Sequence, residues 1–277
     1  MRICVTGHRG YVGSAFVDFA QRCHRPRPHC GKRRPIQWKL VDLAAGQDLL
    51  RAATIHEIRD FAPDILYNFA GSSGERQCEG DPDAWDLNAL VPLRLLNIVQ
   101  PKILVQASSC SLYGLGSLYT ESKAYAEKCF AINENETATI AFRFGTVFGA
   151  NEASMRWDLP MHKMIRDAVV DKLITVPEKV LMRPWLDLDT LCKVLWRVAV
   201  DFAENCVVPK GYHCVPLVSE NLSLQNIAVQ IIHEVGPTEI DWQPPADTRD
   251  YTAPSVIGDC GITGVAISDI AALLEDV

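Results

Sequence analysis

The feature that most constrains the fold is a glycine-rich turn near the N-terminus. The apolar segment Arg2–Thr6 predicts a buried strand, glycines follow at positions 7, 10 and 13, and the apolar pattern of residues 15–20 predicts a helix. In such a turn one glycine allows the tight bend, one lets the backbone approach a pyrophosphate, and one allows close packing of helix on strand. The amides that begin the helix then point at the phosphates. The turn therefore predicts a dinucleotide-binding strand–turn–helix unit.

Strands and helices are predicted to alternate after this turn. Further strands are expected at Ile36–Asp42, Asp64–Phe69 and Ile103–Ala107, with helices at about 51–62 and at Pro82–Gln100 between them. Strands that alternate with helices are typical of a parallel sheet covered on both faces. The predicted fold class is therefore α/β, a Rossmann-type doubly wound parallel sheet, with a small C-terminal substrate-binding lobe.

The alternation becomes less regular from about residue 150. The patterns there predict helices at Leu159–Val170, Leu188–Phe202 and Ser268–Leu274, a short strand at Tyr212–Val215, and a helix capped by Ser223. We therefore expect a dinucleotide-binding domain over residues 1–150, which also includes parts of 175–215, and a small substrate-binding lobe over residues 151–277.

The end of the second predicted strand bears on the choice of dinucleotide. Asp42 lies there, and an acid at this place accepts hydrogen bonds from the adenosine ribose and repels a 2′-phosphate, which favours NAD. Arg9 and the basic segment 22–35 can bind that phosphate, so NADP remains the alternative. Asp48 either contacts the adenine or caps a helix. The candidate cofactor-binding residues are Gly7, Arg9, Gly10, Tyr11, Val12, Gly13, Asp42, Asp48, Phe69, Ala70, Gly71, Asn88, Tyr119 and Lys123.

A tyrosine and a lysine four residues apart follow the fourth predicted strand. On a helix, Tyr119 and Lys123 share one face. A lysine ammonium close to a phenol favours the phenolate and lowers the pKa of the phenol, so that the tyrosine can take a proton from a sugar hydroxyl. Ser109 follows the strand and can hold the same oxygen. Taken alone, Tyr119 and Lys123 also fit an ordinary surface pair. Ser109, Tyr119 and Lys123 are the candidate catalytic residues.

The order of the motifs resembles a known family. The chain contains Thr6-Gly-x-x-Gly-x-x-Gly13, Asn68-x-Ala-Gly71, Ser109-x-x-x-Tyr113-Gly114 and Tyr119-x-x-Ser-Lys123, followed by Arg143–Gly149, Met155–Leu159, Arg183–Asp189 and Asp247–Tyr251. This order resembles the extended short-chain dehydrogenase/reductase family, in particular its NAD-dependent nucleotide-sugar epimerases and dehydratases, over nearly the whole chain.

The resemblance implies roles for several residues. Ser109, Tyr119 and Lys123 match the catalytic triad of the family, and Lys123 is also expected to hold the nicotinamide ribose. The implied substrate is a nucleotide-diphosphate sugar, with Ser109, Thr146, Arg156 and Arg249 as its binding residues. A surface ion pair with Asp247 or Asp250 is the alternative for Arg249. The resemblance also implies a homodimer in which helices at about 82–99 and 117–134 form a four-helix bundle.

Two positions after Ser109 depart from the family and bear on the reaction. Cys110 and Ser111 stand where the 4,6-dehydratases carry an Asp-Glu pair, which disfavours elimination of water. The GDP-fucose synthase branch carries a catalytic cysteine where this chain has Ser111, so 3,5-epimerisation by that route is also disfavoured. The leading hypothesis is a C4 epimerase. The alternatives are a nucleotide-sugar reductase or 4,6-dehydratase on the same triad, or a non-catalytic dinucleotide sensor or scaffold.

Composition narrows the partners and the compartment. The net charge of -7 argues against a partner made of nucleic acid, and no run of about 18 apolar residues predicts a membrane span. The ten cysteines include no Cys-x-x-Cys pair, which suggests reduced thiols and a cytoplasmic location. The segment Cys23–Cys30 holds two cysteines and two histidines, but their spacing fits no usual zinc pattern, so we predict a loop and no metal.

Overall fold

The computed structural model of the protein describes residues 1–24, 35–114, 116–204, 209–245, 249–254 and 264–274. Residues 25–30 of the Cys23–Cys30 segment and Asp247 lie outside these ranges. The chain forms two compact units: Met1–Leu112, Gly116–Arg143 and Cys192–Val215 make the first, and Tyr113–Leu115, Phe144–Leu191 and Pro216–Val277 make the second. Each unit has a buried apolar core of its own.

The first unit is built on a six-stranded sheet with the order β2-β1-β3-β4-β5-β9. Strand β1 is parallel to β2 and to β3, and β3 is parallel to β4. From β1 the chain adds β2 on one side and then crosses to the other side for β3. This reversal creates a switch point between β1 and β3, where α/β sheets bind ligands at the carboxyl ends of their strands. The strands are β1 (Arg2–Thr6), β2 (Gln37–Val41), β3 (Ile65–Asn68), β4 (Ile103–Ser109), β5 (Ala138–Phe144) and β9 (Gly211–Leu217).

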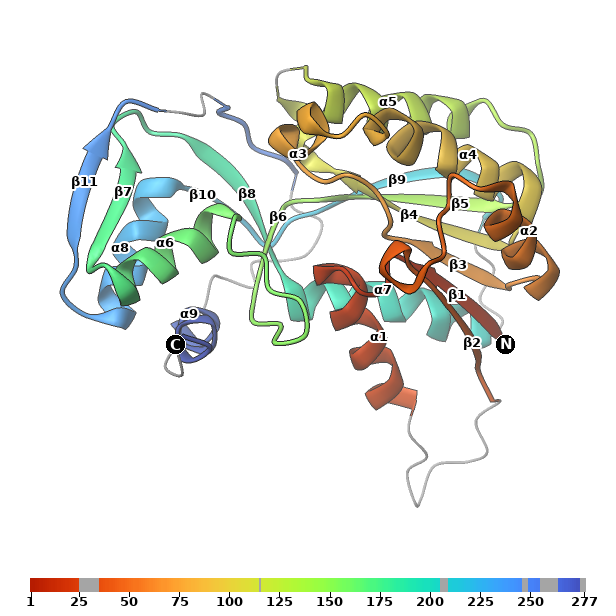
Figure 1. The fold of residues 1–277 in the computed structure, drawn as a ribbon, viewed down its shortest axis with the longest axis horizontal. Helices are drawn as coiled ribbons and strands as arrows, with labels where there is room; N and C mark the ends of the chain where they lie inside the picture. Colours follow the sequence, from red (N-terminus) through yellow and green to blue (C-terminus); the bar gives the residue numbers. More distant parts are fainter. Residues whose placement is uncertain (25–34, 115, 205–208, 246–248, 255–263, 275–277) are drawn as a thin grey trace. The chain divides into compact units, whose positions relative to one another are not determined.

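Helices cover both faces of this sheet (Figure 1). On one face, the Tyr67 ring lies 4.5 Å from the ring of Phe16 in α1 (Tyr11–His24), and its hydroxyl donates to the Leu195 carbonyl in α7 (Leu188–Ala203) at 3.0 Å. On the other face, Leu66 packs in the core that α2 (Ala52–Phe61) and α5 (Leu118–Ala131) complete with Ile58 and Phe130. Because successive strand residues point to opposite faces, both sides of the sheet are apolar. The predicted doubly wound α/β class is confirmed.

The predicted helix over residues 82–100 is correct in place but not in type. The structure has two π-helical segments, η2 (Asp86–Leu90) and η3 (Leu95–Val99), on either side of α4 (Val91–Arg94). Pro92 lies in α4 and cannot donate a backbone hydrogen bond, so the regular helical ladder is interrupted there. A short helix that the sequence did not predict, α3 (Glu75–Gly80), precedes this stretch.

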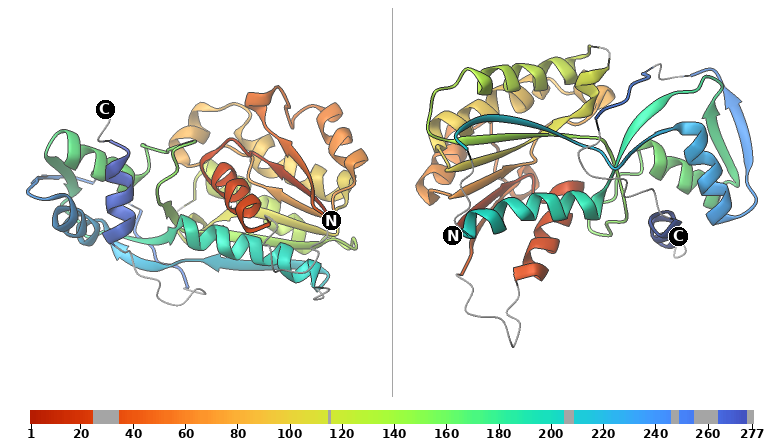
Figure 2. Two further views of the ribbon diagram at one scale, coloured as in Figure 1. Left: turned by 90° about the horizontal axis from the view of Figure 1, so that it is seen from below. Right: turned by 180° about the vertical axis from the view of Figure 1, so that it is seen from behind.

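The second unit contains two small sheets. Strand β8 (Met182–Asp187) lies between β6 (Thr146–Phe148), which is parallel to it, and β10 (Glu220–Ser223), which is antiparallel. Strands β7 (Leu173–Pro177) and β11 (Glu239–Gln243) form a parallel pair. Helices α6 (Pro160–Val170) and α8 (Leu224–Val235) pack against β7, and α9 (Gly264–Ala272) packs against both helices (Figures 1 and 2).

The predicted helices of this unit are observed, and the predicted cap is too: the Ser223 hydroxyl accepts from the Asn226 amide at 3.1 Å. None of the helices in the described ranges combines the length and the apolar character that a membrane crossing requires.

Candidate active site

The glycine turn packs more tightly than any side chain would allow. Gly7 has a φ of 70°, which favours glycine, and its amide donates to the Val41 carbonyl at 2.8 Å. A Cβ at Gly7 would lie 2.6 Å from the Ala70 nitrogen, and one at Gly13 would lie 2.1 Å from the Gly7 carbonyl oxygen. Gly10 is less crowded, since a Cβ placed there would lie 3.3 Å from that oxygen. The turn thus brings the start of α1, with Tyr11 and Val12, to the switch point between β1 and β3.

Asp42 and Arg9 lie together at the end of β2. One oxygen of the Asp42 carboxylate accepts from the Arg9 amide and the other from the Ala44 amide, both at 2.9 Å. The Arg9 guanidinium donates to the Ala44 carbonyl at 3.1 Å. A carboxylate has about four acceptor sites, so Asp42 can still receive ribose hydroxyls. Asp48 closes a local turn by accepting from the Leu50 amide at 2.9 Å.

Helix α5 positions the tyrosine and the lysine. Ser117 and Thr120 form a capping box that begins the helix at Leu118, so Tyr119 lies in the first turn, where the helix dipole favours negative charge. Lys123 follows one turn later and is buried, and its ammonium donates to the Ala107 carbonyl on β4 at 3.2 Å. Burial lowers the pKa of Lys123 to about 8, although the nearby Cys78 and Glu127 act in the opposite direction.

Ser109 is the last residue of β4, the strand whose Ala107 carbonyl accepts from Lys123. It lies two residues beyond Ala107 on β4, it is buried, and its hydroxyl oxygen accepts from the Ser111 amide at 3.1 Å. The structure therefore places Ser109 and Lys123 at the same end of one strand, and Tyr119 on the helix that packs beside it.

Two buried polar atoms close to Lys123 have no partner in the part of the chain that the structure describes. Asn88 is fully buried, and its amide nitrogen donates to the Ser72 carbonyl at 2.9 Å. Its side-chain oxygen and the Ser72 hydroxyl remain without a hydrogen bond. A Cβ on Gly71 would lie 2.5 Å from this oxygen and 3.4 Å from the Lys123 nitrogen. Buried polar atoms nearly always have partners, so this place fits a ligand that carries hydroxyl groups, such as the ribose of a dinucleotide.

A ladder of buried polar side chains crosses the sheet toward Lys123. The Thr6 hydroxyl donates to the Asn68 side-chain oxygen at 2.5 Å, and the Asn68 amide donates to Gln106 at 2.8 Å. Gln106 in turn donates at 2.9 Å to the Ala107 carbonyl, which also receives Lys123. The sequence analysis did not assign these residues. Their signal is a polar side chain at or near the carboxyl end of three apolar strands.

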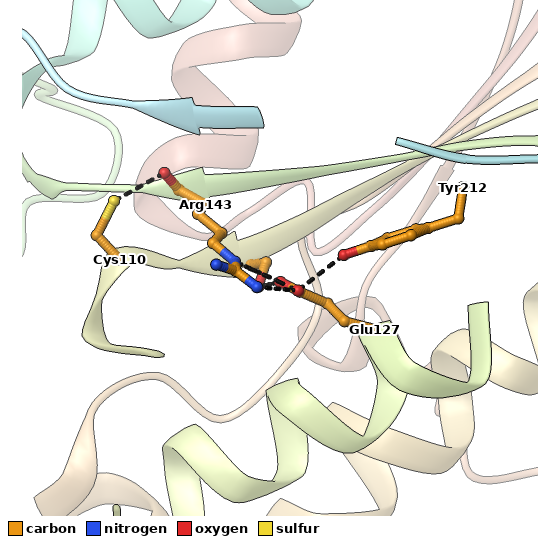
Figure 3. Close-up of polar contacts among 5 residues, drawn as sticks. Cys110, Glu127, Arg143 and Tyr212 are labelled. Atoms are coloured by element: carbon orange, nitrogen blue, oxygen red, sulfur yellow. Dashed lines mark hydrogen bonds and ion pairs between the residues drawn. The ribbon is translucent and has the colours of Figure 1, made fainter. Parts of the chain in front are cut away.

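A second buried cluster surrounds Glu127, one turn after Lys123 (Figure 3). Its carboxylate accepts from Arg143 at 2.6 and 3.1 Å, from the Ser108 hydroxyl at 2.5 Å and from the Tyr212 hydroxyl at 2.7 Å. Burial raises the pKa of Glu127, but the hydrogen bonds from Arg143, Ser108 and Tyr212 outweigh it and hold the pKa below its usual value. The sequence analysis missed this cluster, although the spacing from Lys123 already placed Glu127 on the same helix face.

Cys110 contacts a member of this cluster. It is buried, and its thiol donates to the Arg143 carbonyl at 3.1 Å (Figure 3). Burial raises the pKa of Cys110 to about 12. The thiol is therefore protonated at neutral pH and is a poor base.

The remaining substrate candidates belong to the second unit. Thr146 begins β6. Arg156 binds the Asp158 carboxylate with two contacts of 2.6 Å, which hold the pKa of Asp158 below its usual value. Arg249 is half-buried, and its neighbour Asp250 accepts from the Met182 amide at 3.0 Å.

Arg183 was not assigned a role by the sequence analysis. It is buried on β8 with its guanidinium 5.3 Å from the centre of the Tyr251 ring. The sequence signal was an arginine inside the motif Arg183–Asp189, which is part of the family resemblance. Over the described ranges, no three His, Cys, Asp or Glu side chains cluster closely enough to bind a metal ion.

Comparisons with known proteins give the family of the chain and show the same fold in solved structures. The sequence model of the NAD dependent epimerase/dehydratase family matches residues 3–206. Among solved structures, MoeE5 in complex with UDP-glucose and NAD is 18% identical with a TM-score of 0.77, and the alignment covers 100% of this chain and 99% of that one. No curated protein sequence matches the chain.

Two further solved structures show the same fold. The dTDP-glucose 4,6-dehydratase of Bacillus anthracis str. Ames, in complex with NAD, is 18% identical with a TM-score of 0.75 over 100% of this chain and 97% of that one. The UDP-glucose 4-epimerase of Thermus thermophilus, in complex with NAD, is 18% identical with a TM-score of 0.72 over 100% of both chains.

Proposed function

The chain belongs to the NAD-dependent epimerase/dehydratase family, and from this premise we propose that it epimerises C4 of a nucleotide-linked sugar through a transient keto sugar. The observation that carries the proposal is the setting of Lys123. This buried lysine lies one turn after Tyr119 and beside the Asn88 side-chain oxygen, which has no hydrogen-bond partner among the residues that the structure describes.

The chemistry of each residue follows from its place. Tyr119 takes the proton of the C4 hydroxyl and later returns it, and the positive end of α5 favours the phenolate that carries out this step. The Lys123 ammonium favours the same phenolate. Ser109 donates a hydrogen bond to the sugar oxygen. NAD, when bound, supplies the hydride acceptor and then the hydride donor, and inversion requires the keto sugar to present its other face.

NAD is the cofactor of the family, and this chain has residues that fit it. We assign the pyrophosphate to the turn of Gly7, Gly10 and Gly13, the adenosine ribose to Asp42, and the nicotinamide ribose to Lys123 and Asn88. The other residues assigned to the cofactor are Arg9, Tyr11, Val12, Asp48, Phe69, Ala70, Gly71 and Tyr119. The Asp42 carboxylate at the end of β2 supports NAD rather than NADP, because it repels a 2′-phosphate.

Epimerisation is preferred over elimination of water because of the residues after Ser109. A 4,6-dehydratase needs an acid and a base at this place. The Cys110 thiol donates to the Arg143 carbonyl, and burial raises its pKa to about 12. Ser111 is not an acid. The same burial argues against Cys110 as a base for 3,5-epimerisation.

The proposed substrate is a nucleotide-diphosphate sugar, and its proposed binding residues are Ser109 in the first unit and Thr146, Arg156 and Arg249 in the second. A homodimer through the helices at 82–99 and 117–134 is part of the proposal. It is supported by the exposed apolar side chains of Ile98, Leu118, Tyr125 and Ile132 on these segments. A cytoplasmic location fits the reduced thiols of Cys4, Cys78, Cys110, Cys129 and Cys214.

The test is incubation of the purified protein with a panel of nucleotide sugars, with and without added dinucleotide, followed by chromatography and mass spectrometry. A new isomer of unchanged mass, formed without added reductant, supports the epimerase. Loss of water or gain of two hydrogens selects the dehydratase or the reductase instead. Tyr119→Phe is the control, because it removes the proposed base; an isomer formed equally well by this variant refutes the mechanism.

A further inference from the structure

Helix α5 presents three polar side chains at intervals of one turn. Tyr119, Lys123 and Glu127 are each four residues apart, so they share one face of the helix. Tyr119 and Lys123 carry the proposed chemistry. Glu127 is 5% exposed and lies one turn further from the site.

The Glu127 carboxylate joins this helix to three strands. Ser108 donates from β4, Arg143 from β5 and Tyr212 from β9, and these strands are neighbours in the sheet. Figure 3 shows Arg143 and Tyr212 pointing toward Glu127. Ser108 immediately precedes Ser109. The contact between Ser108 and Glu127 therefore fixes the helix that bears Tyr119 and Lys123 against the strand that bears Ser109.

Arg143 makes this connection rigid in two ways. Its guanidinium contacts Glu127 through two nitrogens, which restrains rotation as well as distance. Its carbonyl accepts from the Cys110 thiol, directly after Ser109, at 3.1 Å. The guanidinium of Arg143 thus contacts Glu127 on α5, and its carbonyl contacts Cys110, next to Ser109.

We propose that Glu127 is a positioning residue for the epimerase reaction, which fixes Tyr119 and Lys123 relative to Ser109 through Ser108, Arg143 and Tyr212. This inference rests on the proposed function. A displacement of about 1 Å in a reacting group can reduce the rate about 100-fold, so an anchor outside the site can control turnover.

Glu127 also acts on Lys123 through its charge. Three titratable groups bear on Lys123: Tyr119 one turn earlier and Glu127 one turn later on the same helix, and Cys78 on α3. The negative charge of Glu127 favours the ammonium. Arg143 is the cation that balances Glu127. Neutralising Glu127 removes the favourable charge and leaves the Arg143 cation unbalanced, and both effects favour neutral Lys123.

The experiment compares Glu127→Gln, Glu127→Asp and Glu121→Gln on the nucleotide sugar that the wild type converts. Glu121 is the matched control, because it is exposed on the same helix and undergoes the same chemical change. We expect Glu127→Gln to lower kcat by about 100-fold, with KM and the Kd for NAD within about 3-fold of wild type. We also expect the loss of activity at alkaline pH, which follows deprotonation of Lys123, to begin at a lower pH than in the wild type.

The conservative variant separates charge from position. Glu127→Asp keeps the charge but is one methylene shorter, so we expect it to lower kcat by about 10-fold and to keep the pH profile. Glu121→Gln should match the wild type. A folded Glu127→Gln variant with wild-type kcat and pH profile would overturn the proposal. So would a variant in which KM and Kd rise as much as kcat falls while the pH profile stays fixed.

Milder variants keep the test decisive if Glu127→Gln does not fold. Tyr212→Phe and Ser108→Ala each remove one hydrogen bond to Glu127, and we expect kcat to fall by about 3- to 10-fold in each with unchanged NAD affinity. Wild-type kcat in both would overturn the proposal.

Hydrogen exchange distinguishes this failure from failure of the proposed function. Should the wild type convert no nucleotide sugar, amide exchange over Leu118–Ala131 still reports on the anchor. Faster exchange in Tyr212→Phe than in Glu121→Gln supports anchoring by Glu127, whereas equal exchange refutes it.

Discussion

Two neighbouring turns of α5 carry buried charges, of which one has few hydrogen-bond partners and the other has several. Lys123 makes one hydrogen bond within the described ranges, to the Ala107 carbonyl, and the oxygen of Asn88 beside it has none. Glu127, one turn later, receives donors from three strands. Both side chains are almost completely buried.

This contrast distinguishes a ligand site from a scaffold. Burying a charge is unfavourable unless the protein provides partners. The partners of Glu127 are complete, so its surroundings are stable without a ligand. Lys123 has a single hydrogen-bond partner within the described ranges, and burial lowers its pKa. We infer that the missing partners at Lys123 belong to cofactor and substrate.

The largest predicted effect sharpens this comparison by removing Lys123. Lys123→Met should reduce turnover of the nucleotide sugar by about 1000-fold, since it removes the charge that supports Tyr119. It should leave the free energy of unfolding unchanged or raised, because a buried ammonium with few partners is exchanged for an apolar chain of similar length. Turnover is measured by steady-state kinetics and stability by urea unfolding. A large loss of stability would show that Lys123 belongs to the scaffold.

The counterpart for Glu127 is a loss of stability. Glu127→Gln should reduce the free energy of unfolding by about 3–5 kcal/mol, because breaking a buried pair leaves the Arg143 cation without its partner. Glu136→Gln is the control, since Glu136 pairs with Lys210 on the surface and should contribute at most about 1 kcal/mol. Equal losses in the two variants in urea unfolding would contradict the distinction between scaffold and surface.

The elements of the first unit are largely predictable because buried parallel strands are continuous apolar runs. Arg2–Thr6 and Ile65–Asn68 are of this kind, and glycines mark where they end. Strand β8 of the second unit was not predicted as a strand. It contains arginine, proline and aspartate, and its position depends on pairing with β6 and β10, which local pattern does not report.

The same reason limits prediction of the site. Tyr119 and Lys123 share a helix, so their spacing alone placed them on one face. The partners of Glu127 are 16, 19 and 85 residues away in sequence, and only the fold brings them to it. The Asn88 oxygen lacks a hydrogen-bond partner within the described ranges, and no sequence pattern signals this, because a missing partner depends on every neighbour in the fold. The roles assigned to the site residues remain predictions.

A smaller effect is expected from pH. The ammonium of Lys123 is the competent form and its pKa is lowered to about 8, so the charge is complete below that pH and is lost above it. We expect kcat/KM to fall about tenfold per pH unit above about pH 8. Lys123→Arg should remove this fall, whatever its absolute rate, because arginine stays charged. A wild-type profile that stays flat up to about pH 9.5 would contradict the lowered pKa.

The smallest predicted effects come from a matched pair of serines. Ser72 has a buried hydroxyl that lacks a partner in the described part of the chain, whereas the buried hydroxyl of Ser108 donates to Glu127. Ser72→Ala should therefore leave the free energy of unfolding unchanged or slightly raised, and should weaken NAD binding by about 2- to 10-fold, the value of one net hydrogen bond.

Ser108→Ala should do the reverse. It removes a donor from a buried carboxylate and should lower the free energy of unfolding by about 1–3 kcal/mol, with NAD affinity unchanged. Urea unfolding and titration with NAD measure both quantities on both variants. If the two variants lose stability equally and bind NAD equally, an unsatisfied hydroxyl near Lys123 does not mark the cofactor site. If Ser72→Ala weakens only NAD binding and Ser108→Ala lowers only stability, then the surroundings of Lys123 serve binding and those of Glu127 serve stability.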